Sequence, residues 1–187
     1  TCRELGIITD NIHVCHNSET DSYLAIEDAQ GLKAAIAQVK NVEKFSDKIL
    51  KPLENGIAKT KSEFSKNLII LDGNLSPSIL SKIAKNKNFM NYDVRIVSAS
   101  PAKAIRLQPF LNLSNTTIYC NKNEAEILCK LVFKNTKEAS SHLLKKGLGR
   151  AIVTDGANPI CDSTINQKPI LILPPKVKYI RHVSGAG

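Results

Sequence analysis

Between residues 67 and 157, short apolar runs alternate with amphipathic segments, and this order constrains the fold more than any other feature. The predicted strands are "NLIILDG" (67–73), "YDVRIVSAS" (92–100), "NTTIYC" (115–120) and "RAIVTDGA" (150–157). Helix patterns follow them at 76–89, 101–111, 121–132 and 136–148. Strands that alternate with helices predict an α/β fold with an open, mostly parallel sheet. The unbroken apolar run at 68–71 further predicts helices on both faces of that sheet.

The N-terminal part follows a different pattern. Three segments alternate apolar and polar residues, "NIHVCH" (11–16), "SYLAIED" (22–28) and "LKAAIAQV" (32–39), and predict a small antiparallel β-meander over about residues 9–40. Residues 1–8 are typical of a helix end that stops at Gly6, and 43–57 of a helix interrupted by Pro52. After 157, "PICDST", "KPILILPPKV" and "YIRHV" are expected to form antiparallel or edge strands. We therefore expect a β-meander at about 9–40 and an α/β core at about 41–187.

Composition argues against several classes of protein. The formal charge of +9 raises nucleic acid as a partner, but the lysines are scattered between apolar residues, and aromatic residues are only 5% with no Trp. No apolar run is long enough to span a membrane, and no signal peptide is evident. The five cysteines are odd in number and lack C-x-x-C spacing, so we expect a cytoplasmic protein without disulfides. Cys15 lies between His13 and His16, which we interpret as an exposed strand and not as a metal site.

Three short motifs follow predicted strands, where ligands bind in open α/β sheets. Asn121 and Glu124 stand between a strand and a helix, which suits either a capping box or a carboxylate that holds hydrated Mg²⁺. Thr154 and Gly156 follow the next buried strand. The tripeptide 185–187, Gly-Ala-Gly, is either a plain turn or a cradle of backbone amides for an anion.

The order of these motifs resembles that of the ribokinase-like, or PfkB, family of carbohydrate kinases, over essentially the whole chain. Within the family, the stretches 70–76, 97–112 and 20–39 are most similar to pseudouridine kinases, and 20–39 to their substrate lid. Family members continue the Gly-Ala-Gly motif with an aspartate and carry further N-terminal strands. On this resemblance we expect the chain to be a partial kinase domain, inactive by itself because the catalytic Asp after Gly187 is missing. Tyr119, Cys120 and Pro159 depart from the family pattern.

The resemblance implies transfer of the γ-phosphoryl group of ATP to a primary hydroxyl, with pseudouridine and its 5′-OH as the best candidate. Gly185, Ala186 and Gly187 would form the anion hole, Asn121, Glu124, Thr154 and Gly156 would bind Mg-ATP, and Glu124 would hold Mg²⁺ through water. The candidates for the nucleoside site are Ser22, Tyr23, Asp72, Asn74 and Lys103. Each of these five is equally compatible with turn capping or surface charge.

Three alternatives stay open. The acceptor could be another sugar or nucleoside, as in ribokinase, fructokinase or adenosine kinase. The chain could also be a non-catalytic nucleotide-binding protein with a kinase-like sheet, or a basic module that binds nucleic acid, which we do not expect. For partners, we expect a small-molecule sugar or nucleoside, no nucleic acid and no membrane. A homodimer through the meander is possible because "NIHVCH" would expose strand edges.

Overall fold

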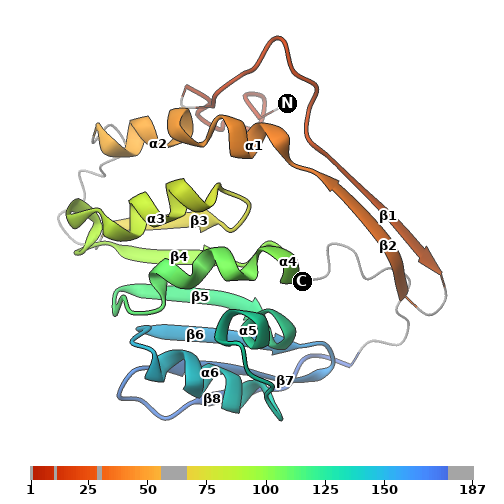
Figure 1. The fold of residues 1–187 in the computed structure, drawn as a ribbon, viewed down its shortest axis with the longest axis vertical. Helices are drawn as coiled ribbons and strands as arrows, with labels where there is room; N and C mark the ends of the chain where they lie inside the picture. The colour runs from red at the N-terminus through yellow and green to blue at the C-terminus, as the bar shows by residue number, and fades with distance from the viewer. Residues whose placement is uncertain (1, 11, 29–30, 56–66, 177–187) are drawn as a thin grey trace. The chain divides into compact units, whose positions relative to one another are not determined.

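The computed structural model describes residues 2–10, 12–28, 31–55 and 67–176. These residues divide into two compact units, one up to residue 55 and the other from residue 67 to residue 176. The first unit contains a β-hairpin and two helices, and the second contains a six-stranded sheet with its helices (Figure 1).

The hairpin of the first unit pairs β1 (Ser22–Asp28) with β2 (Gly31–Gln38) in antiparallel register, with Ser22 opposite Gln38. Helix α1 (Lys40–Lys44) follows directly, and the Asp21 carboxylate accepts hydrogen bonds from the backbone N–H groups of Asn41 (3.0 Å) and Val42 (3.1 Å) at its start. Helix α2 (Ser46–Glu54) contains Pro52. Asp21, 20 residues before Asn41, thus joins the start of the hairpin to the N-terminus of α1, where a negative charge is favoured.

Two N-terminal predictions are wrong. Residues 12–16 form no strand, so the predicted three-stranded meander is a two-stranded hairpin within the described residues. Residues 2–6 form turns and not the end of a helix, although Gly6 does adopt a positive φ of 73°. A strict alternation of apolar and polar residues is compatible with irregular backbone, and a strand needs a partner strand for its hydrogen bonds.

The sheet of the second unit has the strand order β3-β4-β5-β6-β7-β8. Its strands are β3 (Leu68–Asp72), β4 (Asp93–Val97), β5 (Thr116–Asn121), β6 (Arg150–Asp155), β7 (Asn158–Thr164) and β8 (Ile170–Ile172). The first four pair in parallel, and β7 and β8 add antiparallel strands after β6. The predicted mostly parallel α/β sheet is therefore confirmed, together with the antiparallel strands after residue 157.

Helices connect the parallel strands. They are α3 (Pro77–Lys85), η1 (Lys87–Phe89), α4 (Pro101–Ala104), η2 (Ile105–Phe110), α5 (Lys122–Cys129) and α6 (Thr136–Lys145). Side-chain caps start α3, α5 and α6, because Ser76, Asn121 and Asn135 each accept a backbone N–H three residues ahead, and Asn86 caps η1 through the Asn88 N–H. The core lies between these helices and the sheet, where Leu80, Ile96, Leu107, Ile118, Leu143 and Val153 are fully buried.

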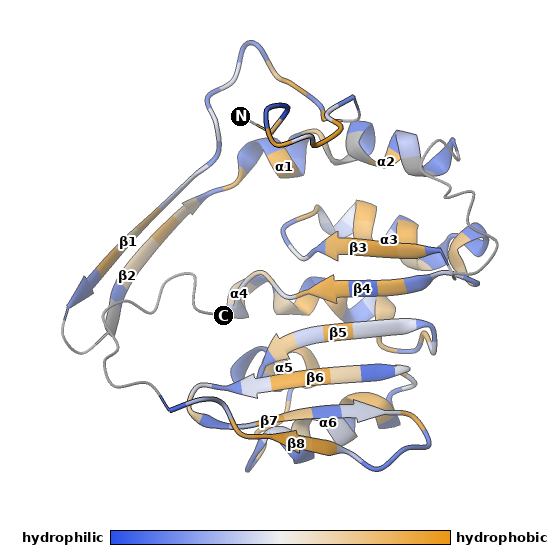
Figure 2. Cartoon of the chain, turned by 180° about the vertical axis from the view of Figure 1, so that it is seen from behind, coloured by the Kyte–Doolittle hydropathy of each residue, from blue (hydrophilic) through white to orange (hydrophobic). Residues whose placement is uncertain are grey.

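The predicted sheet with its helices is confirmed, and among the described residues of this unit the helices cover one face (Figures 1 and 2). Helices α3 to α6 all lie on the same side of the strands, as the two opposite views in Figures 1 and 2 show. On β3, Ile69 and Leu71 are buried on that side, whereas Leu68 is 49% exposed and Ile70 69% exposed. An unbroken apolar run therefore does not reveal which segment covers each face, because adjacent side chains of a strand point to opposite sides.

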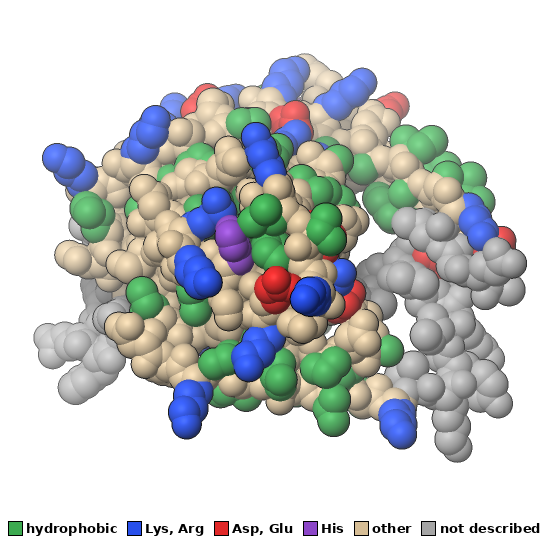
Figure 3. Space-filling view, turned by 60° about the horizontal axis from the view of Figure 1, so that its bottom comes forward, with side chains coloured by type: hydrophobic (Ala, Val, Ile, Leu, Met, Phe, Trp, Pro, Cys, Tyr) green, Lys and Arg blue, Asp and Glu red, His purple; other side chains and the backbone are tan. Residues whose placement is uncertain are grey.

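One face of the molecule carries its positive charge diffusely (Figure 3). On the face shown in Figure 3, Lys and Arg side chains are spread singly among other residues. Among the described residues, no helix has the length and apolar character needed to cross a membrane.

Candidate active site

The predicted site residues of the second unit gather at the carboxyl ends of the parallel strands. Asp72 is the last residue of β3, Asn121 of β5, and Thr154 the penultimate residue of β6. Asn121 and Thr154 are direct partners in the register between β5 and β6. The loops that lead into α3, α4 and α5 start from this same edge, where α/β sheets bind ligands.

Asn121 and Glu124 form a complete capping box at the start of α5. The Asn121 side chain accepts the Glu124 N–H at 2.8 Å, and the Glu124 carboxylate accepts the Asn121 N–H at 2.9 Å. The structural interpretation of this motif is therefore correct. It does not compete with a role in binding, because only one carboxylate oxygen of Glu124 is used by the cap.

Glu124 is a carboxyl group held in an unusual place. Its side chain is only 6% exposed, and this burial raises its pKa above the ordinary value for glutamate, although the Asn121 N–H and the nearby Ser98 hydroxyl act in the opposite direction. Ser98 follows β4, and its Oγ is buried without a hydrogen-bond partner of good geometry among the described residues. A buried carboxylate beside an unsatisfied hydroxyl is a place where a cation or its bound water would be stabilised.

This donor set fits Mg²⁺ held through water. Among the described residues, no group of three His, Cys, Asp or Glu side chains could enclose a metal ion. Mg²⁺ does not need such a group, because it keeps several waters and is usually held by one or two carboxylates and the phosphates of the substrate. Glu124 with the Ser98 hydroxyl meets that requirement.

The loop after β3 brings three predicted substrate residues together. The Asp72 carboxylate accepts the Asn74 backbone N–H at 2.8 Å and the Asn74 side-chain amide at 3.1 Å. Lys103, from α4, donates to the Asn74 side-chain oxygen at 2.7 Å. Gly73 sits where a Cβ would lie 2.9 Å from the Val97 carbonyl oxygen, so only glycine allows this close approach of the loop to β4.

The turn between β6 and β7 contains the other nucleotide motif. Thr154 is partly buried, and Gly156 has φ +55° in the turn, beside a hydrogen bond of 3.0 Å between the side chains of Asn158 and Asp155. Pro159, which departs from the family pattern, offers its carbonyl to the Thr136 hydroxyl at 2.7 Å. A cavity of about 330 Å³ opens beside this turn. Its lining residues include Lys134, Asn135, Thr136, Lys137, Asp155, Asn158 and Leu171.

The remaining predicted site residues lie outside the described part of this unit. Gly185, Ala186 and Gly187 lie outside the described residues. Ser22 and Tyr23 belong to β1 of the first unit, where Tyr23 is 58% exposed.

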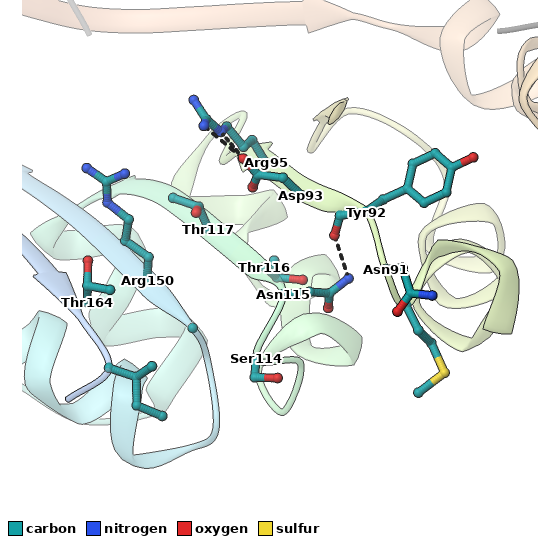
Figure 4. Close-up of a pocket in the computed structure, with 13 residues that line it drawn as sticks. Asn91, Tyr92, Asp93, Arg95, Ser114, Asn115, Thr116, Thr117, Arg150 and Thr164 are labelled. Carbon is teal, nitrogen blue, oxygen red and sulfur yellow. Dashed lines mark hydrogen bonds and ion pairs between the residues drawn. The ribbon is translucent and has the colours of Figure 1, made fainter. Parts of the chain in front are cut away.

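A second, polar cavity lies at the opposite, amino edge of the sheet. It measures about 490 Å³, and Figure 4 shows Arg95, Thr117, Arg150 and Thr164 side by side on β4, β5, β6 and β7. Both guanidinium groups are paired, Arg95 with Asp93 at 2.8 Å and Arg150 with Asp162, which raises the pKa of each arginine and lowers that of Asp162. This edge was not predicted as a site.

Two residues of the carboxyl edge were missed by reasoning from sequence. Ser98 could have been found, because it lies at the carboxyl end of the predicted strand 92–100. Arg106 could not: it donates to the carbonyl oxygens of Asn74 and Leu75, 32 and 31 residues away along the chain, and no local pattern indicates such a contact.

Comparison with known proteins agrees with this arrangement. Among solved structures, a carbohydrate kinase from Agrobacterium tumefaciens matches with a TM-score of 0.65 and 25% identity, over 91% of this chain and 52% of that one. Ribokinase of Arabidopsis thaliana, in complex with ribose and ATP, matches with a TM-score of 0.65 and 17% identity, over 91% and 53%. Phosphofructokinase-2 of Escherichia coli, in complex with fructose-6-phosphate, matches with a TM-score of 0.54 and 18% identity, over 74% and 45%.

The chain thus spans about half the length of these solved chains. No curated protein matches it significantly. The family model described as "pfkB family carbohydrate kinase" matches residues 1–187, so the chain belongs to the pfkB family of carbohydrate kinases, and its sheet is the ribokinase-like fold.

Proposed function

We propose that the protein transfers the γ-phosphoryl group of ATP to a primary hydroxyl of a sugar or nucleoside. The observation that carries the proposal is the carboxyl edge itself. There Asn121 and Thr154 are register partners, and Glu124 is a buried carboxylate at the N-terminus of α5. Membership of the carbohydrate kinase family supports the same reaction.

Phosphoryl transfer needs positioning and charge neutralisation more than covalent chemistry. Glu124, with Ser98, would hold Mg²⁺ through water, and the bound ion would neutralise charge on the transferring phosphates. Thr154 and Gly156 would line the nucleotide groove, and the N-terminus of α5 would favour the negative charge of the phosphates. The amides of Gly185, Ala186 and Gly187 would hold the transferring oxygens.

As acceptor we propose the 5′-OH of pseudouridine. The stretches 70–76 and 97–112 that resemble pseudouridine kinases are the two that form the Asp72–Asn74–Lys103 cluster. A carboxylate and an ammonium bridged by one amide suit a polar acceptor with several hydroxyl groups. Ser22 and Tyr23 of the hairpin would complete the acceptor site.

Two measurements test these proposals. Calorimetric titration of the 187-residue chain with ATP, with and without Mg²⁺, tests nucleotide binding without requiring turnover. Release of ADP by the full-length protein with pseudouridine, ribose, fructose and adenosine tests the reaction and the acceptor. We expect Mg²⁺-dependent ATP binding and fastest turnover with pseudouridine.

The outcomes are separable. A faster reaction with a free sugar would replace pseudouridine as acceptor and leave the kinase intact. Mg-ATP binding without turnover on any acceptor would instead favour a non-catalytic nucleotide-binding protein.

We also propose that the β1–β2 hairpin pairs with a second copy of the chain. Its apolar side chains are exposed on both strands, with Leu24 59%, Ile26 58% and Ile36 65% exposed. Exposed apolar residues on a free hairpin are typical of an interaction surface. Light scattering should give the mass of a dimer, and Ile26→Lys should give the mass of a monomer.

A cytoplasmic location is proposed from the cysteines. All five lie in the described part of the chain and are free thiols, and Cys120, Cys129 and Cys161 are buried. Burial raises the pKa of the Cys120 and Cys129 thiols and so disfavours their thiolate forms.

A further inference from the structure

Four residues at the end of β3 form a turn whose polar groups are almost all occupied. Asp72 to Leu75 close a backbone turn, with the Leu75 N–H donating to the Asp72 carbonyl at 3.1 Å, and the Gly73 N–H donates to the Val97 carbonyl at 3.0 Å. The side chain of Asn74 is held at both ends, by the Asp72 carboxylate and by the Lys103 ammonium. The Asn74 side chain is therefore fixed in place between these two charged groups.

The carbonyl groups of Asn74 and Leu75 have no place in a backbone ladder, because they precede the first turn of α3. Arg106 donates hydrogen bonds to both of them. Its Nη1 donates to the Asn74 oxygen at 3.3 Å and to the Leu75 oxygen at 3.2 Å. One nitrogen of the guanidinium thus bridges two successive carbonyls, and a lysine ammonium at the same place has enough N–H donors to do the same.

The backbone of Arg106 is held in place by the packing of its neighbours. It lies in η2, between the buried residues Ala104 and Leu107, and η2 packs against α3. Lys103, two residues before η2 begins, comes from the same short helical segment. Residues 103 and 106 therefore hold the turn from one side, Lys103 through a side chain and Arg106 through the backbone.

We propose that Arg106 is a positioning residue of the acceptor site, which holds the turn 72–75 and thereby orients the Asp72 carboxylate and the Lys103 ammonium toward the acceptor. Asn74 is then a positioning residue as well, and Asp72 and Lys103 are the groups that meet the hydroxyl groups of a sugar or nucleoside. The part of this inference that concerns the acceptor rests on the proposed kinase function. The hydrogen bonds by which Arg106 holds the turn 72–75 are independent of that function.

The test compares Arg106→Gln, Arg106→Lys and a control, Lys85→Gln, which removes one positive charge from an exposed position on α3. Hydrogen exchange of the ligand-free chain directly measures how stably the turn 72–75 is held. In Arg106→Gln the Asn74 and Leu75 amides should exchange about tenfold faster, while the Ile69 and Leu71 amides of β3 are unchanged. Lys85→Gln should behave as the wild type throughout.

Steady-state kinetics of the full-length protein, with pseudouridine and Mg-ATP as substrates, tests the effect of Arg106 on acceptor binding. Arg106→Gln should raise KM for pseudouridine about tenfold with KM for ATP within about twofold, and Arg106→Lys should recover most of the loss. A defect that is only structural would move both KM values or lower the thermal midpoint without rescue by lysine.

Two results would overturn the inference. Unchanged exchange of the Asn74 and Leu75 amides in Arg106→Gln would show that the turn does not depend on Arg106. Faster exchange with an unchanged KM for pseudouridine would show that the turn does not orient acceptor groups. If the wild-type protein phosphorylates no acceptor, the kinase proposal fails, and the exchange experiment still decides whether Arg106 holds the turn.

Discussion

Replacing Glu124 by glutamine separates the contribution of this side chain to folding from its proposed contribution to phosphoryl transfer. The Glu124 carboxylate accepts the Asn121 N–H at 2.9 Å, and a glutamine side-chain oxygen can accept the same bond. The glutamine NH₂ would then face the Ser98 hydroxyl, which has an unused oxygen to accept it. Glu124→Ala, in contrast, removes the partner of the Asn121 N–H and leaves a gap.

The expected magnitudes follow from these contacts. An unsatisfied buried donor costs about 1–3 kcal/mol, so Glu124→Ala should lower the free energy of unfolding by that amount. Glu124→Gln should be at least as stable as the wild type at pH 8, because the buried carboxylate, whose pKa is raised by desolvation, no longer has to be ionised there. Both variants should lose about 10²-fold in turnover, since neither offers a negative charge to the metal.

The raised pKa of Glu124 fixes the direction in which the stability of the wild type changes with pH. The folded state holds the Glu124 proton more tightly than the unfolded state, so the wild type loses stability as pH rises from the unfolded pKa through the folded pKa. The advantage of Glu124→Gln should therefore grow with pH and vanish at low pH. Glu126, on the same helix, provides the control: the Phe133 N–H lowers its pKa, so Glu126→Gln should be less stable than the wild type at neutral pH and converge with it in acid.

Urea unfolding between pH 4 and pH 8 measures the free energy of unfolding of each variant, from the midpoint at constant m-value. Release of ADP by the full-length protein measures turnover. The reasoning fails if Glu124→Gln is destabilised as much as Glu124→Ala. It also fails if the glutamine variant turns over at the wild-type rate, because Glu124 would then be a helix cap and nothing more.

Three further predictions concern stability, each checked by urea unfolding of the 187-residue chain. Asn121→Ala and Asn135→Ala each remove a side-chain cap, at 2.8 and 2.9 Å, and should cost about 1 kcal/mol apiece; the double variant should show the sum, since the caps start different helices. Gly149→Ala should cost at least about 2 kcal/mol, because its Cβ would lie 2.0 Å from the Ser114 carbonyl oxygen; a cost near zero would mean that this loop yields freely. Leu107→Ala should cost about 2–5 kcal/mol, since Leu107 is fully buried between η2 and its neighbours, and a smaller loss would indicate that the cavity collapses.

Local physics allowed much of the core to be predicted. The helix starts at Ser76, Asn121 and Asn135 are set by side chains that cap the backbone within three residues, so they are visible in sequence. The strands β3 to β6 are equally local, because apolar runs of this length between helical segments have few other ways to be buried. Placing Asp72, Asn121 and Thr154 at one edge then followed from the parallel order alone.

Other features depend on partners that are distant along the chain. Whether 12–16 pairs as a strand, and which face of β3 receives helices, are decided by what lies beside each segment and not by its own pattern. The same holds for Arg106, whose donors reach carbonyls more than 30 residues away. The amino-acid sequence thus determined the elements, their caps and the edge that carries the site. Tertiary structure decided the contacts between elements, because a hydrogen bond or a buried surface depends on both of its partners.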